Sequence, residues 1–223
     1  MRRRSRQGGS AIEFAICLPV LIMLLLGTFG IGISMLRQLQ VVQLARDAGC
    51  MYARKVDFTD AGSQNILSRV AGSLGLTPGS GATGTAGAGS TVVILSTIQY
   101  VSASVCTSAG RAATVAACPN LGSWVFAERL VIGNTSLLTS SLGTPTASIV
   151  NTTTGAITPL NECTVAGDKV TGYNPWTSST ITNTNNALST IQGQLIYVSE
   201  AASRGFQIPP YSSGTMLYSQ LYF

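Results

Sequence analysis

The sequence predicts an α+β fold, with one long N-terminal helix followed by a small antiparallel β-rich domain. Three observations predict it. No residue from Phe14 to Leu36 carries a charge, and a helical spacing of apolar residues continues beyond that run. The segment from Gly79 to Ser90 contains only Gly, Ser, Ala and Thr. After it, stretches rich in β-branched residues alternate with clusters of Ser, Thr, Asn, Gly and Pro, which is typical of strands joined by turns.

The composition excludes several functional classes. The chain has 223 residues, with 13 Lys and Arg, 8 Asp and Glu, and no His. Without His it cannot form a His-based catalytic triad or an imidazole metal site. Four of the basic residues lie in the first eight positions, so the rest of the chain is nearly neutral and we expect no nucleic-acid binding. No nucleophile has a recognisable base nearby in the sequence, and we predict no enzymatic activity, no cofactor and no metal site.

The uncharged run predicts a membrane-spanning helix. At about 1.5 Å per residue, Phe14 to Leu36 would extend about 34 Å, enough to cross a hydrocarbon layer of about 30 Å. A secretory signal peptide has a shorter apolar core and a small-residue cleavage site after it. The basic residues Arg2, Arg3, Arg4 and Arg6 place the N-terminus in the cytoplasm by the positive-inside rule. We therefore expect a single-pass protein of a bacterial inner membrane, in contact with membrane lipid, with its C-terminal domain outside. The alternative is a buried core helix of a soluble protein.

The helix is predicted to continue past the membrane, over residues 9–56. Apolar or small residues recur there at helical spacing, at Val41, Leu44, Ala45, Ala48, Met51, Tyr52 and Val56. This outer half is amphipathic and should pack one face on the domain that follows. Gly49 lowers the helix propensity by about 1 kcal/mol relative to Ala, which would allow a bend.

The remainder is predicted to divide into a Gly/Ser/Ala-rich linker region at 57–90 and a β-rich extracytoplasmic domain at 91–223. Within the linker region, residues 79–90 read as a flexible linker or mobile loop. A phosphate-binding loop is disfavoured, because no Lys-Ser/Thr pair or helix start follows. We expect strands at 91–105, at 124–132, within 188–199, and at 215–223.

Five cysteines are spread along the chain. Cys17 lies inside the apolar run and should act as a small hydrophobic residue. The other four would lie in an oxidising compartment, where two disulfides are expected. We favour a pair between Cys106 and Cys118, which flank a short loop between two predicted strands, and this leaves Cys50 with Cys163. A zinc site is disfavoured because no Cys-x-x-Cys spacing exists, and free thiols are a further alternative.

A carboxylate lies at the start of the predicted span. Residues 7–14 read Gln-Gly-Gly-Ser-Ala-Ile-Glu-Phe, so Glu13 follows a basic leader and a run of small residues. A charge at the centre of a membrane helix costs about 2.5–3.5 kcal/mol, and less near the interface. Glu13 therefore either has a partner of opposite charge or lies solvated at the level of the lipid headgroups.

These residues resemble a class III prepilin signal, in which a prepilin peptidase cuts after a Gly and four residues precede a Glu-Phe pair. The resemblance places the cut between Gly8 and Gly9, so that residues 1–8 form a cytoplasmic leader. Glu13 and Phe14 then form the pair. A cut after Gly9 is the alternative.

The segments that follow resemble the TadE-like family, the minor pseudopilins of the tight-adherence (Tad/Flp) pilus system. The resemblance covers roughly residues 4–56, through the Leu18-Pro19-Val20 run, the Gly27-Thr28-Phe29-Gly30 run and the Gln43-Leu44-Ala45-Arg46-Asp47-Ala48 run. Thr28 departs from the family, which often has an acidic residue before the Phe-Gly pair.

The resemblance implies a pilin-like fold and a non-enzymatic role in pilus assembly, surface adherence or secretion. It implies three kinds of partner: a prepilin peptidase, other pilins or pseudopilins, and the inner-membrane Tad assembly platform. It also implies that Glu13 pairs with the new α-amine of its own or a neighbouring chain and fixes the register between subunits. Pro19 should kink or locally unwind the helix. The alternative function is a membrane-anchored adhesin or binding domain that is not built into a filament.

Overall fold

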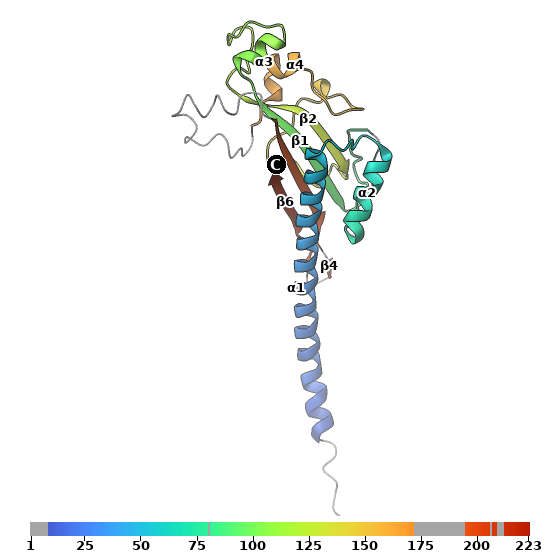
Figure 1. The fold of residues 1–223 in the computed structure, drawn as a ribbon. Helices are drawn as coiled ribbons and strands as arrows, with labels where there is room; N and C mark the ends of the chain where they lie inside the picture. Colours follow the sequence, from blue (N-terminus) through green and yellow to red (C-terminus); the bar gives the residue numbers. More distant parts are fainter. Residues whose placement is uncertain (1–8, 80, 172–194, 206, 209–211) are drawn as a thin grey trace, which may run out of the picture.

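The protein consists of a long helix, α1 (Gly9–Ala53), and a head built on a four-stranded sheet (Figure 1). The computed structural model describes residues 9–79, 81–171, 195–205, 207–208 and 212–223. The first half of α1 projects from the head, and its second half lies against the sheet (Figure 1). The prediction of an α+β fold with an N-terminal helix is confirmed. The predicted leader, residues 1–8, lies outside the described residues.

The sheet has the strand order β2-β1-β3-β6, and every neighbouring pair is antiparallel. Its strands are β1 (Thr91–Tyr100), β2 (Trp124–Gly133), β3 (Leu195–Arg204) and β6 (Met216–Tyr222). The four predicted strands are therefore present, although residues 188–194 of the third lie outside the described part. The first ends earlier than predicted, because Ser102 caps a short helix, α3 (Ala103–Ser108), by accepting a hydrogen bond from the N–H of Val105 (3.5 Å).

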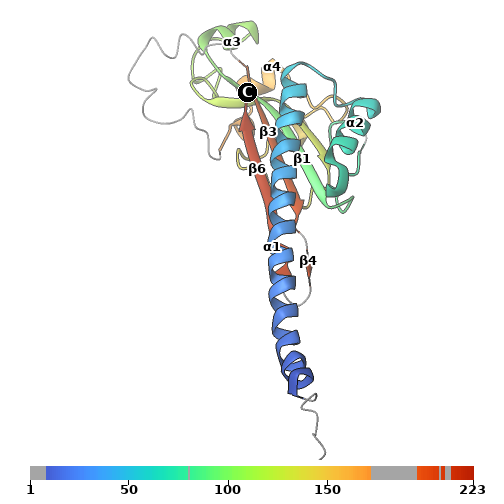
Figure 2. The same cartoon turned by 60° about the horizontal axis from the view of Figure 1, so that its bottom comes forward.

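The outer half of α1 packs on one face of the sheet, along β3 and β6 (Figure 2). Its buried residues are those that the helical spacing predicts, Val41, Leu44, Ala45, Ala48 and Tyr52. They join side chains of the sheet, Val93, Leu95, Leu130, Ile132 and Ala201, in one hydrophobic core. The Tyr52 hydroxyl also forms a buried hydrogen bond with Thr97 Oγ1 (2.7 Å), which ties the end of α1 to β1.

Helix α1 ends at Ala53, three residues before the predicted end at Val56. Lys55 adopts a left-handed conformation (φ 65°), which turns the chain out of the helix. The N–H of Val56 donates to the carbonyl of Met51 (3.1 Å), and the N–H of Lys55 donates to the carbonyl of Tyr52 (2.9 Å). These bonds satisfy carbonyls that the last turn would otherwise leave without partners.

Gly49 does not interrupt α1, so the helix continues through the position where the sequence would allow a bend. A Cβ atom at this position would overlap the aromatic ring of Phe223. The backbone of Phe223 is held beside β3, where its N–H donates to the carbonyl of Tyr197 (2.8 Å). Glycine at position 49 therefore allows close approach of a ring to the helix.

Part of the predicted linker at residues 57–90 is instead a helix of the head. Helix α2 (Ala61–Ala71) begins after Asp60, whose carboxylate accepts a hydrogen bond from the N–H of Ser63 (3.1 Å). A 3₁₀ turn, η1 (Gly72–Leu74), follows it. Buried Leu67 joins the core formed with α1. The sequence did not predict this helix, because its Ser, Asn and Gly residues have low intrinsic helix propensity.

The Gly-rich segment that follows α2 is held by hydrogen bonds. The N–H of Val131 in β2 donates to the carbonyl of buried Ala82 (2.8 Å). The buried amide of Gln64 accepts from the N–H of Gly79 (3.0 Å) and donates to the carbonyl of Gly81 (3.1 Å). Residues too small to form a core are thus fixed to β2 and α2 through their backbone, which differs from the predicted mobile loop.

The opposite face of the sheet is covered by residues 134–171, which follow β2. Residues alternate along β1, so that Val93 and Leu95 face α1 while Ile94 faces this second layer. The layer contains η2 (Ala147–Ile149), α4 (Pro159–Thr164) and η3 (Ala166–Asp168). A two-stranded hairpin, β4 (Gln207–Ile208) with β5 (Ser212–Ser213), lies between β3 and β6 in the chain.

Candidate functional site

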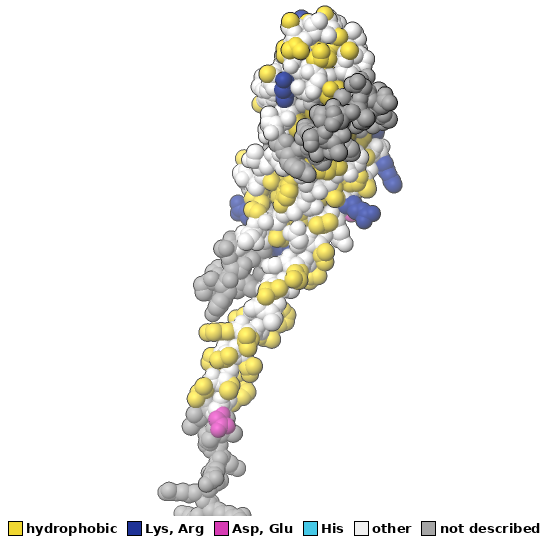
Figure 3. Space-filling view, turned by 90° about the vertical axis from the view of Figure 1, so that its left-hand side faces the viewer, with side chains coloured by type: hydrophobic (Ala, Val, Ile, Leu, Met, Phe, Trp, Pro, Cys, Tyr) yellow, Lys and Arg dark blue, Asp and Glu magenta, His cyan; other side chains and the backbone are white. Residues whose placement is uncertain are grey.

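The projecting part of α1 carries the residues predicted to act in assembly. We define the stalk as residues 13–36. Glu13 and Phe14 lie at its free end, and Phe14 is 63% exposed. Figure 3 shows apolar side chains along the stalk, and contact of this surface with water would be unfavourable. The exposed large apolar residues of the stalk are Phe14, Ile16, Leu18, Val20, Leu21, Ile22, Met23, Leu24, Leu25, Leu26, Phe29, Ile31, Met35 and Leu36.

The stalk has the dimensions of a membrane span. Among the described residues, one helix, Glu13–Ala53, is long and apolar enough to cross a membrane, with a mean hydropathy of 2.5 over its most apolar window. None of that window is buried within the protein. In a core helix of a soluble protein, this apolar window would be buried. The structure therefore does not support the alternative of a buried core helix.

A shallow hollow lies on one side of the stalk. It is lined by Thr28, Phe29, Gly32, Ile33 and Leu36. The Thr28 hydroxyl donates to the carbonyl of Leu25 (2.9 Å), so this polar group is satisfied within the helix. Apart from Gly32, its two chain neighbours and the nearby backbone of α1, no atom lies within 4 Å of where a Cβ of Gly32 would stand. Small residues at this spacing leave room for the backbone of another helix to approach.

The predicted kink and cleavage residues lie on either side of Glu13. Pro19 lies inside α1, and the helix continues on both sides of it. Proline has no N–H and so removes one helical hydrogen bond, but the kink itself stays a prediction. Gly8 lies outside the described residues, and α1 begins at Gly9.

Polar side chains just beyond the stalk connect it to the head. Arg37 Nη1 donates to the carbonyl of Arg204 at the end of β3 (3.2 Å). Gln38 Nε2 donates to the carbonyl of Tyr218 in β6 (3.2 Å). The stalk therefore leaves the head at a defined angle, as a continuation of the packed half of α1.

The cysteines form one disulfide, between Cys106 and Cys118, as predicted. The second predicted pair does not form. Cys50 is a half-buried free thiol on α1, and Cys163 is a buried free thiol on α4. Cys163 instead packs against the disulfide, in an apolar cluster with Val101 and Val125. The prediction was wrong because Cys50 and Cys163 were paired only as the two cysteines that remained. The fold instead places α4, which carries Cys163, beside α3.

Three sulfur atoms thus lie together in the head. The Sγ atoms of Cys106, Cys118 and Cys163 are all within 4.8 Å of one another. A structural zinc site needs four ligands, with thiolate rather than disulfide sulfur. With the disulfide formed, this cluster offers only one thiol, that of Cys163. Burial raises the pKa of this thiol, and the charge of Glu162 raises it further by a smaller amount. Its geometry suits a change of disulfide partner better than metal binding.

Two buried carboxyls lie beside this cluster. Asp168 is fully buried, and neither of its carboxylate oxygens has a hydrogen-bond partner among the described residues. Burial, with the nearby Glu162, raises the pKa of Asp168 to about 8. Burial also raises the pKa of Glu162 to about 7, although the Gln99 amide donates to its carboxylate. Both groups therefore favour the protonated form in the folded protein.

We expect the head to lose stability as the pH rises from 5 to 8. The pKa values of Glu162 and Asp168 are higher in the folded protein than in the unfolded chain. At pH values between the unfolded and the folded pKa, the folded protein therefore binds more protons than the unfolded chain. Its free energy of unfolding then falls as the pH rises and the two carboxyls ionise. Each carboxyl that is protonated in the folded chain alone lowers stability by up to about 1.4 kcal/mol per pH unit. The loss is measured by urea unfolding of the full chain in neutral detergent at several pH values.

The Asp168→Asn variant should remove most of this slope. Asp57 provides the control, because its carboxylate accepts hydrogen bonds from Thr59, which lower its pKa and place its titration below the tested range. The Asp57→Asn variant should keep the wild-type slope between pH 5 and 8. An Asp168→Asn protein with an unchanged slope would contradict the assignment.

Comparison with known proteins bears on the N-terminal region. A family model described as TadE-like protein matches residues 8–49. No curated protein and no solved structure matches the chain. The matched residues contain the whole stalk and most of the helical face that packs on the sheet. The resemblance noted in the sequence is thereby confirmed, and through residues 8–49 this chain is similar to the TadE-like proteins.

Proposed function

We propose that this chain is a non-enzymatic minor pseudopilin of a tight-adherence pilus. In this role it is stored in the inner membrane through its stalk, with the N-terminus in the cytoplasm and the head outside. A prepilin peptidase removes residues 1–8, and the processed chain then joins other pilins or pseudopilins through the assembly platform. The observation that carries the proposal is the exposed apolar stalk with Glu13 at its free end, inside the segment that matches the family.

The shape of the stalk supports assembly as well as anchoring. A single-pass anchor needs only length and hydropathy. The stalk also has a hollow over Thr28 and Gly32, which suits contact with another helix. Its end carries a carboxylate, which is costly among apolar helices unless a cation pairs with it. The α-amine created by cleavage before Gly9 would be such a cation, four residues from Glu13.

The intact mass of the protein recovered from cells tests the proposal. A chain that begins at Gly9 and is found in sheared surface fibres is expected, and a chain that begins at Ser10 would move the cut to the alternative site. A Gly8→Leu variant should keep the leader and remain with the inner membrane. Wild-type protein that still carries the leader would refute processing and favour the membrane-anchored adhesin.

A further inference from the structure

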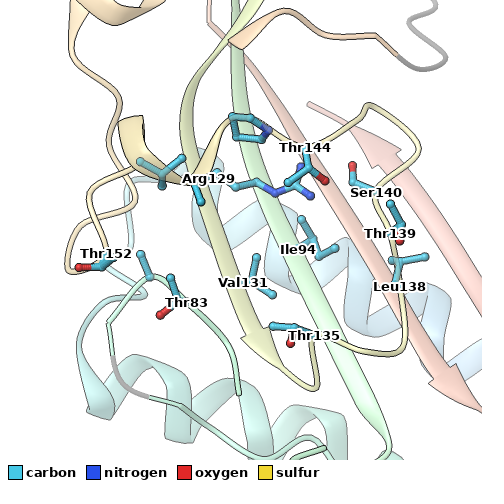
Figure 4. Close-up of a pocket in the computed structure, with 14 residues that line it drawn as sticks. Thr83, Ile94, Arg129, Val131, Thr135, Leu138, Thr139, Ser140, Thr144 and Thr152 are labelled. Carbon is cyan, nitrogen blue, oxygen red and sulfur yellow. The ribbon is translucent and has the colours of Figure 1, made fainter. Parts of the chain in front are cut away.

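A cavity of about 350 Å³ lies on the face of the sheet opposite α1 (Figure 4). Its floor is formed by β1 and β2, and its walls are formed by the chain that follows β2 and by the Gly-rich segment. Apolar side chains that include Ile94, Val131 and Leu138 line much of it. Thr83, Thr139 and Thr144 add hydroxyl groups at its edges (Figure 4). Its volume is at the lower end of the range for small-molecule pockets.

The cavity contains a buried cation, Arg129, which is 6% exposed. Its Nη1 donates to Ser96 Oγ (3.0 Å), and its guanidinium lies over the ring of Phe126 (5.5 Å). Burial lowers the pKa of Arg129 to about 10, so the group remains charged at neutral pH. Within the described part of the chain, Nε and Nη2 donate to no acceptor and the guanidinium has no ion pair. Nε is itself enclosed by the protein, so Nη2 is the donor left for a carboxylate, through a charge-assisted hydrogen bond.

The nearest candidate for an internal counterion is already occupied. Glu200 on β3 faces the same layer, and its charge acts on Arg129. Its carboxylate accepts hydrogen bonds from the hydroxyls of Ser140, Ser141 and Tyr218 and from the N–H of Ser141. These donors hold Glu200 away from a direct pair with Arg129. The site therefore has a nearby negative charge and, at Nη2 of Arg129, an unfilled hydrogen-bond donor.

We propose that this cavity binds a small amphipathic monocarboxylate. Its carboxylate would pair with Nη2 of Arg129, and its apolar body would lie against Ile94, Val131 and Leu138. A single negative charge is favoured over a phosphate dianion, because a second charge would face Glu200 without a cation to balance it. The limited volume favours a free small molecule over an acidic side chain of a protein partner.

Titration of the full chain in neutral detergent with benzoate, followed by ligand-observed NMR, tests the site. We expect saturable binding of benzoate and at least tenfold weaker binding of benzamide, which has the same ring without the charge. Arg129→Met should weaken benzoate binding at least tenfold, while Arg111→Met, at an exposed arginine outside the cavity, should leave it unchanged. Equal binding of benzoate and benzamide would overturn the proposal.

A second variant keeps the test valid if removal of Arg129 unfolds the head. Leu138→Trp fills the cavity from its wall and leaves the guanidinium in place, so it should also weaken benzoate binding at least tenfold. Unchanged benzoate binding in a folded Leu138→Trp protein would place the ligand elsewhere and overturn the proposal. The peptide acetyl-Gly-Glu-Gly-amide presents a carboxylate on a protein side chain, and tighter binding of this peptide than of benzoate would overturn the assignment to a free small molecule.

Discussion

Replacing Glu13 with Ala is expected to reduce incorporation of the chain into surface fibres at least tenfold, while the leader is still removed. Glu13 stands at the free end of the apolar stalk. Among packed apolar helices it would pair with the α-amine of its own or a neighbouring chain. Two such charges about 4 Å apart attract by about 4 kcal/mol at an effective dielectric constant of 20, before desolvation. The measurement compares the amount of chain in sheared fibres with the amount in the inner membrane.

The same helix offers a matched control for this prediction. Asp47 is an exposed carboxylate of α1 that lies beyond the stalk. Asp47→Ala should therefore leave incorporation near the wild-type level. Glu13→Gln, which keeps the shape but loses the charge, should behave like Glu13→Ala. Normal incorporation of a processed Glu13→Ala chain would remove the proposed role of the carboxylate, and loss of processing would show that Glu13 acts at the peptidase instead.

Much of α1 could be predicted because its determinants are local. The uncharged run and the helical spacing of Val41, Leu44, Ala45, Ala48 and Tyr52 each depend only on residues within a few turns. The structure buries these five side chains and leaves the apolar run exposed. The strands were likewise visible as β-branched stretches between turn clusters.

The region between α1 and β1 could not be predicted in the same way. Its order depends on partners that are distant in the sequence, such as Val131, whose N–H binds the carbonyl of Ala82. Composition alone reports what a segment of Gly, Ser and Ala lacks, namely a core of its own. It does not report that another element supplies the missing contacts. The cap at Asp60 was a local signal for α2.

The buried charges of the head were missed for a related reason. Arg129 and Glu200 lie in strands, among apolar residues. The alternation of side chains along a strand predicts which residues share a face of the sheet, but not which face the loops cover. A charge between two apolar stretches of a strand is the signal that marks such positions. In this chain it applies to Arg129 in Trp124–Gly133. Cys163 was assigned to the wrong partner because the proximity of α3 and α4 has no local signature.

Loss of the disulfide should have the largest effect on the stability of the head. The double variant Cys106→Ser/Cys118→Ser is expected to lower the free energy of unfolding by about 3 kcal/mol, because the bond closes a loop with a sequence separation of 12 and so restricts the unfolded chain. Both cysteines are fully buried, so their replacement also places hydroxyls in an apolar cluster. Urea unfolding of the oxidised full chain in neutral detergent measures the change, and Cys50→Ser, at a half-buried free thiol, is the control.

The third sulfur should make the single variants milder than the double variant. In Cys106→Ser, the thiols of Cys118 and Cys163 lie close enough to pair, since their Sγ atoms are within 4.8 Å of each other. An added oxidant would accept the two electrons and two protons that this pairing releases. Peptide mapping without reductant should therefore find a Cys118–Cys163 bond in Cys106→Ser, and further replacement of Cys163 by Ser should bring stability down to that of the double variant. Free thiols at both positions after oxidation would show that Cys163 on α4 does not approach Cys118 as the structure has it.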